Sequence, residues 1–327
     1  MEKPMPLAWP EHLISSAADP SVRRRFDRGE CVRLVSGWYV ETARWLAAKD
    51  FERFVWVLAA RSTRSGRFVL CGEAALIAMG LPTFGPPRVI SVAESLAGRS
   101  GQRSDTLSVR GPAAAQALDV WRPVIRRHTH DGAWVGEMNT GTFRTAGLLP
   151  AVLEVLGGAP LVRALPIVDA LTQWDLVAQA DVVDAILGLP SVAARKRARL
   201  AWESGSSLSG SVGESVSRAL FVGAGLEEPK LQLGLVDGRG LIGYVDFCWP
   251  GVRVIGEFDG KLKYDGTFGA SRSADQVFGQ EKTRENRLTA LGYRVVRWGW
   301  ADLYRPEQLI RTLRAAGVAQ RADREAA

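Results

Sequence analysis

The chain has 327 residues, of which 46% are hydrophobic and 24% are charged, a composition that excludes a disordered or collagen-like protein. A single hydrophobic core rarely grows beyond about 250–300 residues, so this length favours two or more domains. The 42 lysines and arginines outnumber the 35 aspartates and glutamates, and this basic balance is compatible with a partner that carries phosphate groups.

Cysteine usage and the first residues bear on the cellular compartment. Cys31, Cys71 and Cys248 are odd in number and widely spaced, which excludes a disulfide framework and a paired C-x-x-C metal motif. Residues 1–16 lack the basic start and apolar run of a secretion signal, and no stretch reaches the roughly 18 apolar residues of a membrane helix. We therefore expect a cytoplasmic protein without membrane contact.

The first predicted elements lie in residues 16–39. A short polar-capped segment predicts a helix, and the alternating apolar residues after it predict a hairpin around Ser36-Gly37. This unit has the pattern of a small winged-helix fragment, in which helix arginines contact phosphates and the hairpin is the wing. A solvated basic helix packed on a structural hairpin explains the pattern equally well. The candidate DNA-binding residues here are Arg23, Arg24 and Arg25.

The middle of the chain alternates helical and β-rich patterns. Helical spacing of apolar residues predicts helices over 51–62, 70–80, 147–155, 164–178, 180–188 and 191–202. Short β-rich runs (PRVISVA, DTLSVRG and VIRRHTH) within 87–145 predict a small sheet. Asp169 lies among apolar residues, where a carboxylate can cap a helix or pair with an arginine. The sequence ESGSSLSGSVG has the most linker-like composition, which places a domain boundary near 203–210.

Acidic residues gather in the strands predicted after this boundary. The pattern predicts a helix over 211–223 and strands over 230–235, 241–248 and 252–259. Glu257 and Asp259 are two residues apart at the end of the third strand, and such side chains share one face, which Lys261 extends. The neighbouring strand of the hairpin can bring Asp246 alongside them.

Such a cluster has a rationale in phosphodiester hydrolysis. Carboxylates hold Mg²⁺ or Mn²⁺ while leaving water in place, and the ion activates water and neutralises charge on the phosphate. A nearby lysine stabilises charge in the transition state. The alternative is a surface hairpin whose carboxylates face water and pair with Lys261 and Lys263.

Glu214 has two explanations. It opens the predicted helix three residues after Ser211, and this spacing is that of a capping box, which needs the glutamate for the helix start alone. A carboxylate at this position can also belong to an acidic site.

The next predicted elements are a helix that begins at Glu281 and ends at Gly292, and a strand over 293–299. Basic side chains on the helix can reach a phosphate or form ion pairs within the helix. Lys282 and Arg284 lie nearer the helix start, where the helix dipole favours an anion, than Arg287 does.

Two stretches of the C-terminal region carry a resemblance to a known family. VDFCWPGVRVIGEFDGKLKY followed by EKTRENRLTALGYRVVRWGWADL resembles nuclease-like domains similar to the very-short-patch-repair endonucleases of the PD-(D/E)XK superfamily. The resemblance covers roughly 208–316. It implies a helical acid at Glu214, a metal-binding acid at Asp246 and a second acid at Glu257.

The sequence departs from the superfamily pattern at one position. The pattern has a lysine two residues after the second acid, where this chain has Asp259. Either Asp259 adds a metal ligand and Lys261 or Lys263 supplies the cation, or the site has lost its chemistry; the run EFDGKLKY matches the subfamily and favours Lys263. The predicted metal ligands are Asp246, Glu257 and Asp259, and the predicted catalytic residues are these three with Glu214, Lys261 and Lys263.

The N-terminal region resembles a second family. RGECVRLVSGWYV followed by LCGEAALIAMGLP resembles abortive-infection-type antitoxins of the AbiEi family, in which a winged helix precedes a second, helical domain. The resemblance implies DNA binding by this region but assigns no residue to it.

Together these patterns predict an α/β protein with three parts. We expect a winged-helix-like unit over 1–48, an α/β middle domain over 49–205 and a restriction-endonuclease-like domain, a mixed sheet flanked by helices, over 206–327. The leading function is a metal-dependent DNA endonuclease or nickase with Mg²⁺ or Mn²⁺ as cofactor. The alternative is a non-catalytic DNA-binding regulator or antitoxin with a degenerate nuclease-like domain, since the fold does not decide function.

Overall fold

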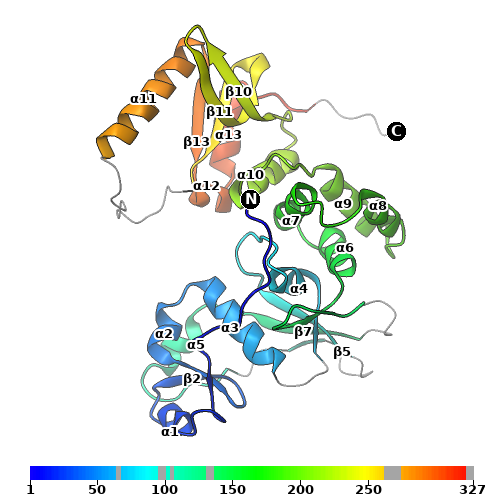
Figure 1. Ribbon diagram of the computed structural model, residues 1–327, viewed down its shortest axis with the longest axis vertical. Coiled ribbons are helices and arrows are strands. Elements are labelled where there is room, and N and C mark those ends of the chain that lie inside the picture. The colour runs from blue at the N-terminus through cyan, green and yellow to red at the C-terminus, as the bar shows by residue number, and fades with distance from the viewer. Residues whose placement is uncertain (64–67, 95–100, 104–106, 130–135, 261–273, 322–327) are drawn as a thin grey trace. The chain divides into compact units, whose positions relative to one another are not determined.

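The computed structural model describes residues 1–63, 68–94, 101–103, 107–129, 136–260 and 274–321 (Figure 1). The chain forms two compact units. The N-terminal unit comprises residues 2–159 and 177–199, and the C-terminal unit comprises 160–176 and 200–327 together with Met1. Both units combine helices with sheets, which confirms the predicted α/β class.

The N-terminal unit begins with a small sheet and two short helices. Its elements are β1 (Ile14–Ser15), α1 (Val22–Asp27), β2 (Cys31–Val35), β3 (Trp38–Glu41) and α2 (Thr42–Ala47). The strands are antiparallel in the order β1-β3-β2. Val22 and Phe26 of α1 pack against Cys31 and Tyr39 of the sheet, because helical spacing puts both on one face. The predicted helix and hairpin are confirmed.

A six-stranded sheet forms the middle of this unit. Its strands are β4 (Val69–Leu70), β5 (Val89–Glu94), β6 (Gly101–Arg103), β7 (Val124–Thr129), β8 (Met138–Asn139) and β9 (Arg144–Thr145), in the order β6-β7-β5-β4-β9-β8. PRVISVA and VIRRHTH correspond to β5 and β7, which pair in parallel. In the described part of DTLSVRG, Ser108 forms one isolated bridge with Arg33 in place of the predicted strand.

Further helices complete the unit. They are α3 (Asp50–Ser62), α4 (Gly72–Ala78), α5 (Ala114–Asp119), α6 (Leu148–Gly158), α8 (Gln179–Leu187) and α9 (Val192–Glu203), whose last residues are counted with the C-terminal unit. Helix α4 packs on β5 of this sheet and against α6. Their apolar residues at helical spacing are buried, among them Leu76, Ala151 and Leu156.

The C-terminal unit is built on a mixed four-stranded sheet. Its elements are α7 (Leu161–Gln173), α10 (Val212–Gly223), β10 (Lys230–Asp237), β11 (Gly240–Trp249), a 3₁₀ turn (Pro250–Val252), β12 (Val254–Phe258), α11 (Ala274–Ala290), β13 (Arg294–Trp298), α12 (Trp300–Tyr304) and α13 (Glu307–Ala315). Strands β10, β11 and β12 are antiparallel neighbours, and β13 runs parallel to β12. Helix α11 lies between these parallel strands in the chain, as a parallel crossover requires.

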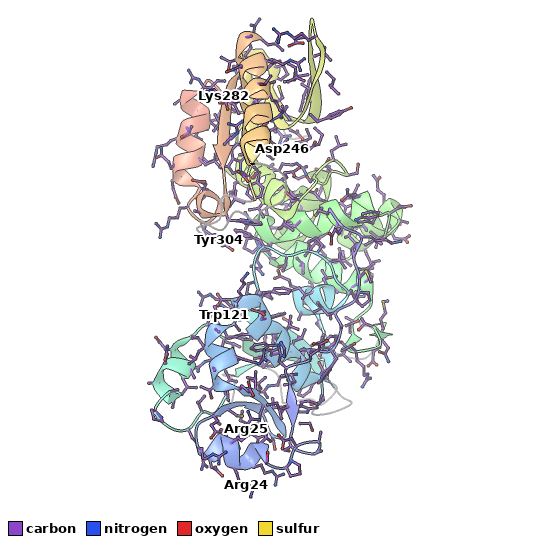
Figure 2. All side chains as sticks on the ribbon, turned by 60° about the vertical axis from the view of Figure 1, so that its left-hand side comes forward. Arg24, Arg25, Trp121, Asp246, Lys282 and Tyr304 are labelled. Atoms are coloured by element: carbon purple, nitrogen blue, oxygen red, sulfur yellow. The ribbon has the colours of Figure 1, made fainter. Side chains whose placement is uncertain are left out.

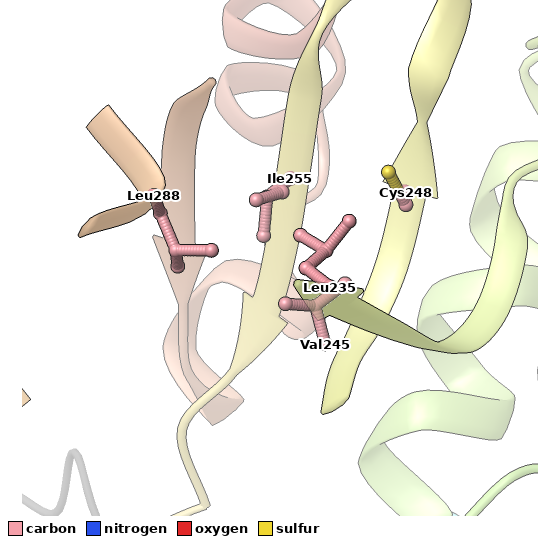
Figure 3. Close-up of a cluster of buried hydrophobic side chains, with 5 residues drawn as sticks. All are labelled: Leu235, Val245, Cys248, Ile255 and Leu288. Carbon is pink, nitrogen blue, oxygen red and sulfur yellow. The ribbon is translucent and has the colours of Figure 1, made fainter. Parts of the chain in front are cut away.

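Two apolar clusters hold the helices of the C-terminal unit to the sheet. Phe221 of α10 makes edge contacts with Phe247, Trp249 and Trp298 of the strands, at centroid distances of 5.4 Å, 5.6 Å and 5.8 Å. The second cluster joins Leu288 of α11 to the strands and contains Leu235, Val245, Cys248, Ile255 and Leu288 (Figure 3).

A buried ion pair joins α7 to α10. Asp169 is 0% exposed and accepts two hydrogen bonds, of 2.9 Å and 2.8 Å, from Nη1 of Arg218, which is 7% exposed. The segment predicted as a linker packs around this pair. Ser206 N donates to Asp169, Ser209 Oγ accepts from Arg218, and the Ser204 carbonyl accepts from Arg218 Nη2. Of the two roles the sequence allows for Asp169, the structure has the pairing with arginine.

Candidate functional site

Two acidic residues, Glu214 and Glu257, lie close enough to Asp246 to affect its ionisation, and the three come from three different elements. Glu214 lies in the first turn of α10, Asp246 on β11 and Glu257 on β12. Asp246 Oδ2 accepts a 2.9 Å hydrogen bond from Phe258 N, which ties the carboxylate of β11 to the end of β12. The Phe258 ring fits against Gly213 of α10, where a Cβ atom would lie 2.0 Å from it. Glycine at this position therefore brings the start of α10 close to Asp246.

The surroundings of Asp246 disfavour its ionised form. Burial and the negative charge of Glu214 raise the pKa of Asp246 to about 6, and the charge of Glu257 adds to this rise. Hydrogen bonds from Phe258 N and Gln232 oppose the rise without cancelling it. A carboxylate held among other carboxylates in a half-buried position is a place where added positive charge is favourable.

Gln232 of β10 links two of these acids. Its Nε2 atom donates hydrogen bonds of 3.1 Å to Glu214 Oε2 and 3.2 Å to Asp246 Oδ1. Its φ of 47° lies in the left-handed region, which is costly for a residue with a side chain. With this backbone conformation the Gln232 side chain bridges the carboxylates of Glu214 and Asp246.

Glu214 has both of the features that the sequence allows. Ser211 Oγ accepts from Glu214 N at 3.2 Å, and the Glu214 carboxylate accepts from Gly210 N at 2.8 Å and from Ser211 Oγ at 2.9 Å. These contacts form a reciprocal N-terminal cap. The same carboxylate reaches Asp246 through Gln232 and raises its pKa. The capping role and the place beside Asp246 therefore coexist.

Two arginines hold Glu257. Its carboxylate lies 2.6 Å from Arg284 Nη2 of α11 and 3.1 Å from Arg297 Nε of β13, and its side chain is 13% exposed. Arg297 Nη1 also lies 2.9 Å from Glu285 Oε2. The charge of Glu257 is thus balanced by cations from two neighbouring elements.

Asp259 directly follows β12, and its N–H donates to the Trp298 carbonyl at 2.9 Å. The predicted strand began at residue 252, but the 3₁₀ turn and Arg253, at φ 52°, occupy its first positions. The alternation that was expected to align Asp259 with Glu257 ends with the strand at Phe258. Lys261 and Lys263 lie outside the described residues.

The predicted metal ligands are Asp246, Glu257 and Asp259, and their surroundings differ. Within the described part of the chain, no three His, Cys, Asp or Glu side chains are grouped so that they could hold a metal ion. Carboxylate oxygens are the ligands that Mg²⁺ prefers, so Asp246 with Glu214 beside it has suitable donor chemistry. Glu257 does not fit such an ion while Arg284 and Arg297 balance its charge.

The predicted DNA-binding residues differ in their surroundings. Arg23 and Arg24 on α1 and Lys282 on α11 are exposed. Arg24 and Lys282 are labelled in Figure 2. Arg25 instead pairs with Glu41 at 2.8 Å and so ties α1 to β3.

Arg287 forms a two-pronged ion pair with Asp237 at the end of β10. Its Nη2 and Nε atoms lie 2.6 Å and 2.8 Å from the two carboxylate oxygens, and it also donates to the Gly240 carbonyl. The hydrogen bonds from Arg287 lower the pKa of Asp237 to about 2. Arg287 therefore joins α11 to the β10–β11 turn and is already engaged there.

Sequence analysis missed two residues of the site, Gln232 and Arg297. Gln232 is a polar side chain inside the apolar run KLQLGL, and this break in an otherwise apolar strand is the signal that could have drawn attention to it. Arg297 carries a weaker signal, because arginine often faces solvent on strands of this kind. Its contact with Glu257 depends on β13 pairing beside β12.

The described helices include none that is long and apolar enough to cross a membrane. Comparison of the chain with family models, with curated proteins and with solved structures found no match.

Proposed function

We propose that the C-terminal unit hydrolyses phosphodiester bonds of DNA with a divalent cation, as an endonuclease or nickase. The observation that carries this proposal is Asp246, a half-buried carboxylate whose pKa is raised to about 6 by burial and by two acidic neighbours. Carboxylates whose pKa is shifted by burial together with specific charged neighbours gather at functional sites. The mixed sheet and its helices also agree with the fold that the PD-(D/E)XK resemblance implies.

The residues of the site have separate tasks in this proposal. Asp246 holds Mg²⁺ or Mn²⁺ with Glu214 beside it, and Gln232 keeps the two carboxylates apart at a fixed spacing. A bound divalent cation supplies an acidified water and neutralises charge on the phosphate. Asp259 as a further ligand, and Lys261 or Lys263 as the cation that stabilises the transition state, are assigned from the resemblance.

DNA is the proposed partner, and exposed basic residues supply its phosphate contacts. Arg23 and Arg24 on α1 belong to the part of the chain that resembles AbiEi-type antitoxins and has the winged-helix pattern. Lys282 on α11 belongs to the unit that carries the acids. Phosphate contacts give affinity without reading sequence, so these residues specify no target.

The salt dependence of DNA binding tests these contacts. Each phosphate neutralised contributes about 0.9 to the slope of log affinity against log salt, so replacing Arg23 and Arg24 with Gln should reduce the slope by up to about 2. Arg25→Gln is the matched control and should change the slope little, because Arg25 pairs with Glu41. Fluorescence anisotropy with a labelled duplex measures both. A flat salt profile for the parent would remove DNA from the proposal.

A second function is favoured by Glu257. Its charge is balanced by Arg284 and Arg297, and Asp259 occupies the position where the superfamily has lysine. These observations favour a DNA-binding regulator or antitoxin in which the nuclease-like unit binds without cleaving. The two functions share DNA as partner and differ only in bond cleavage.

A cleavage assay decides between the two. Supercoiled and linear DNA are incubated with the parent chain in Mg²⁺, in Mn²⁺ or in EDTA, and nicked and cut products are separated on a gel. We expect cleavage with the cations, none with EDTA and none with Asp246→Asn. Asp237→Asn is the control, because Asp237 pairs with Arg287 away from the three acids. DNA binding without cleavage by the parent would support the regulator.

A further inference from the structure

The ion pairs of Glu257 are arranged so that a phosphate can replace the carboxylate. The side chains of Arg284 and Arg297 are 23% and 32% exposed, whereas that of Glu257 is 13% exposed. Both arginine side chains are therefore partly accessible to solvent while they contact the less exposed acid. Lys282, two residues before Arg284 on α11, is exposed.

The contact between Arg284 and Glu257 is electrostatic more than directional. Among the described residues Glu257 Oε1 receives no hydrogen bond of good geometry, although Arg284 Nη2 lies 2.6 Å from it. The same Nη2 atom donates at 3.0 Å to the carbonyl of Tyr244 on β11. The guanidinium is thus anchored to the sheet by its own hydrogen bond and can keep this position when the anion beside it changes.

Charge balance sets what the site can bind. In the ion pairs among the described residues, Glu257 and Glu285 contribute the negative charges, and Arg284 and Arg297 contribute the positive ones. A divalent cation that approaches Glu257 meets two guanidinium groups at close range and is repelled. A phosphate diester can accept bidentate hydrogen bonds from the guanidinium groups in place of Glu257. The negative charge of Glu257 is then no longer balanced by the arginines and favours a bound cation.

We propose that Arg284 and Arg297 exchange Glu257 for a DNA phosphate, so that DNA binding releases this carboxylate and makes cation binding at the acidic site depend on DNA. This inference rests on the proposed function and adds its regulation. Without DNA, Arg284 and Arg297 form ion pairs with Glu257 and thereby weaken cation binding. With DNA the same arginines position the phosphate, and Glu257 joins Asp246 in holding the cation.

Mn²⁺ binding to the full chain tests the proposal. Free Mn²⁺ is followed by its electron paramagnetic resonance signal at constant ionic strength, with and without a short duplex, and binding to the duplex alone is subtracted. Coupling between sites in proteins is typically about 5–150-fold, and we expect the duplex to tighten Mn²⁺ binding within this range. By reciprocity Mn²⁺ should tighten binding of the duplex by the same factor.

Variants separate release of Glu257 from other effects of DNA. Arg284→Gln with Arg297→Gln should bind Mn²⁺ tightly without DNA, and the duplex should then add little. Arg287→Gln removes one positive charge from α11, as Arg284→Gln does, but Arg287 pairs with Asp237, so this variant should behave as the parent. If the double variant does not fold by circular dichroism, Arg284→Gln alone should show a smaller shift in the same direction.

The outcomes distinguish this inference from the proposed function. The first outcome is that the parent binds Mn²⁺ equally tightly with and without the duplex, and that the Arg284 and Arg297 variants have the same Mn²⁺ affinity as the parent. That outcome overturns the exchange and leaves the cation site in place. The second outcome is that no variant, even with DNA present, shows Mn²⁺ binding that is lost when Asp246→Asn is introduced. That outcome overturns both the proposed function and this inference.

Discussion

Replacing Asp169 with alanine is expected to lower the free energy of unfolding by about 3–5 kcal/mol, the range observed when one partner of a buried ion pair is removed. Asp169 is 0% exposed and Arg218 is 7% exposed, and both hydrogen bonds between them come from the same Nη1 atom. The alanine variant leaves this guanidinium charged and buried, and among the described residues Ser209 Oγ and the Ser204 carbonyl remain as its acceptors.

Urea denaturation of the full chain measures this loss. Removing both charges, with Asp169→Leu and Arg218→Met together, should recover much of the stability, because a buried pair replaced by apolar side chains is often nearly neutral. The control is Glu30→Ala, which breaks an exposed pair with Arg28 and a longer, 3.7 Å contact with Arg25, and it should cost at most about 1 kcal/mol. An alanine variant at Asp169 as stable as this control would show that the pair does not hold α7 to α10.

Local patterns predicted the elements, and distant contacts decided how they pack. The helix at Val212–Gly223 follows from Ser211 and the apolar spacing after it, and both are local features. The segment 203–210 has the composition of a linker, yet Ser209 is 2% exposed. It packs there because Asp169 and Arg218 lie on either side of it in the chain and meet in space, which composition does not report.

For the site, too, the contacts within the hairpin could be predicted from the sequence, and the contacts between distant elements could not. Asp246 and Glu257 lie on consecutive strands joined by the 3₁₀ turn Pro250–Val252 and Arg253, so their proximity follows from the hairpin. The two arginines on Glu257 come from α11 and β13, and their placement requires the parallel pairing of β12 with β13. Periodicity identifies such a helix and strand but not which strand edge they join.

The second large effect is expected at Asp246, where activity and stability should change in opposite directions. Asp246→Asn removes the charge proposed to hold the cation, and cleavage should fall by at least about 10²–10³-fold, the usual loss for one electrostatic stabiliser. The folded pKa of Asp246 is about 6 against an ordinary value of 3.8, so between these values the folded state binds the proton more tightly. The contribution of Asp246 to the stability of the parent therefore falls as pH rises from about 4 to 6 and stays at the lower level above pH 6.

Asparagine does not ionise, so the variant escapes this fall. The variant also loses one of the two carboxylate oxygens that accept from Phe258 N and Gln232. That loss is the same at pH 4 and at pH 8, so it cancels when the change in stability between these two pH values is compared with that of the parent. Relative to the parent, the variant should gain stability on the order of 1 kcal/mol between pH 4 and pH 8, after allowance for solvent screening at this half-buried site.

Asp237→Asn provides the opposite control for this measurement. Arg287 lowers the pKa of Asp237 to about 2, so the ionised form stabilises the fold above pH 4 and its contribution disappears as pH falls toward 2. Asp237→Asn should therefore be less stable than the parent at pH 8 and still cleave DNA. If Asp246→Asn instead loses stability between pH 4 and pH 8, its carboxylate is a stabilised structural group, and the loss of cleavage in that variant would reflect a damaged fold.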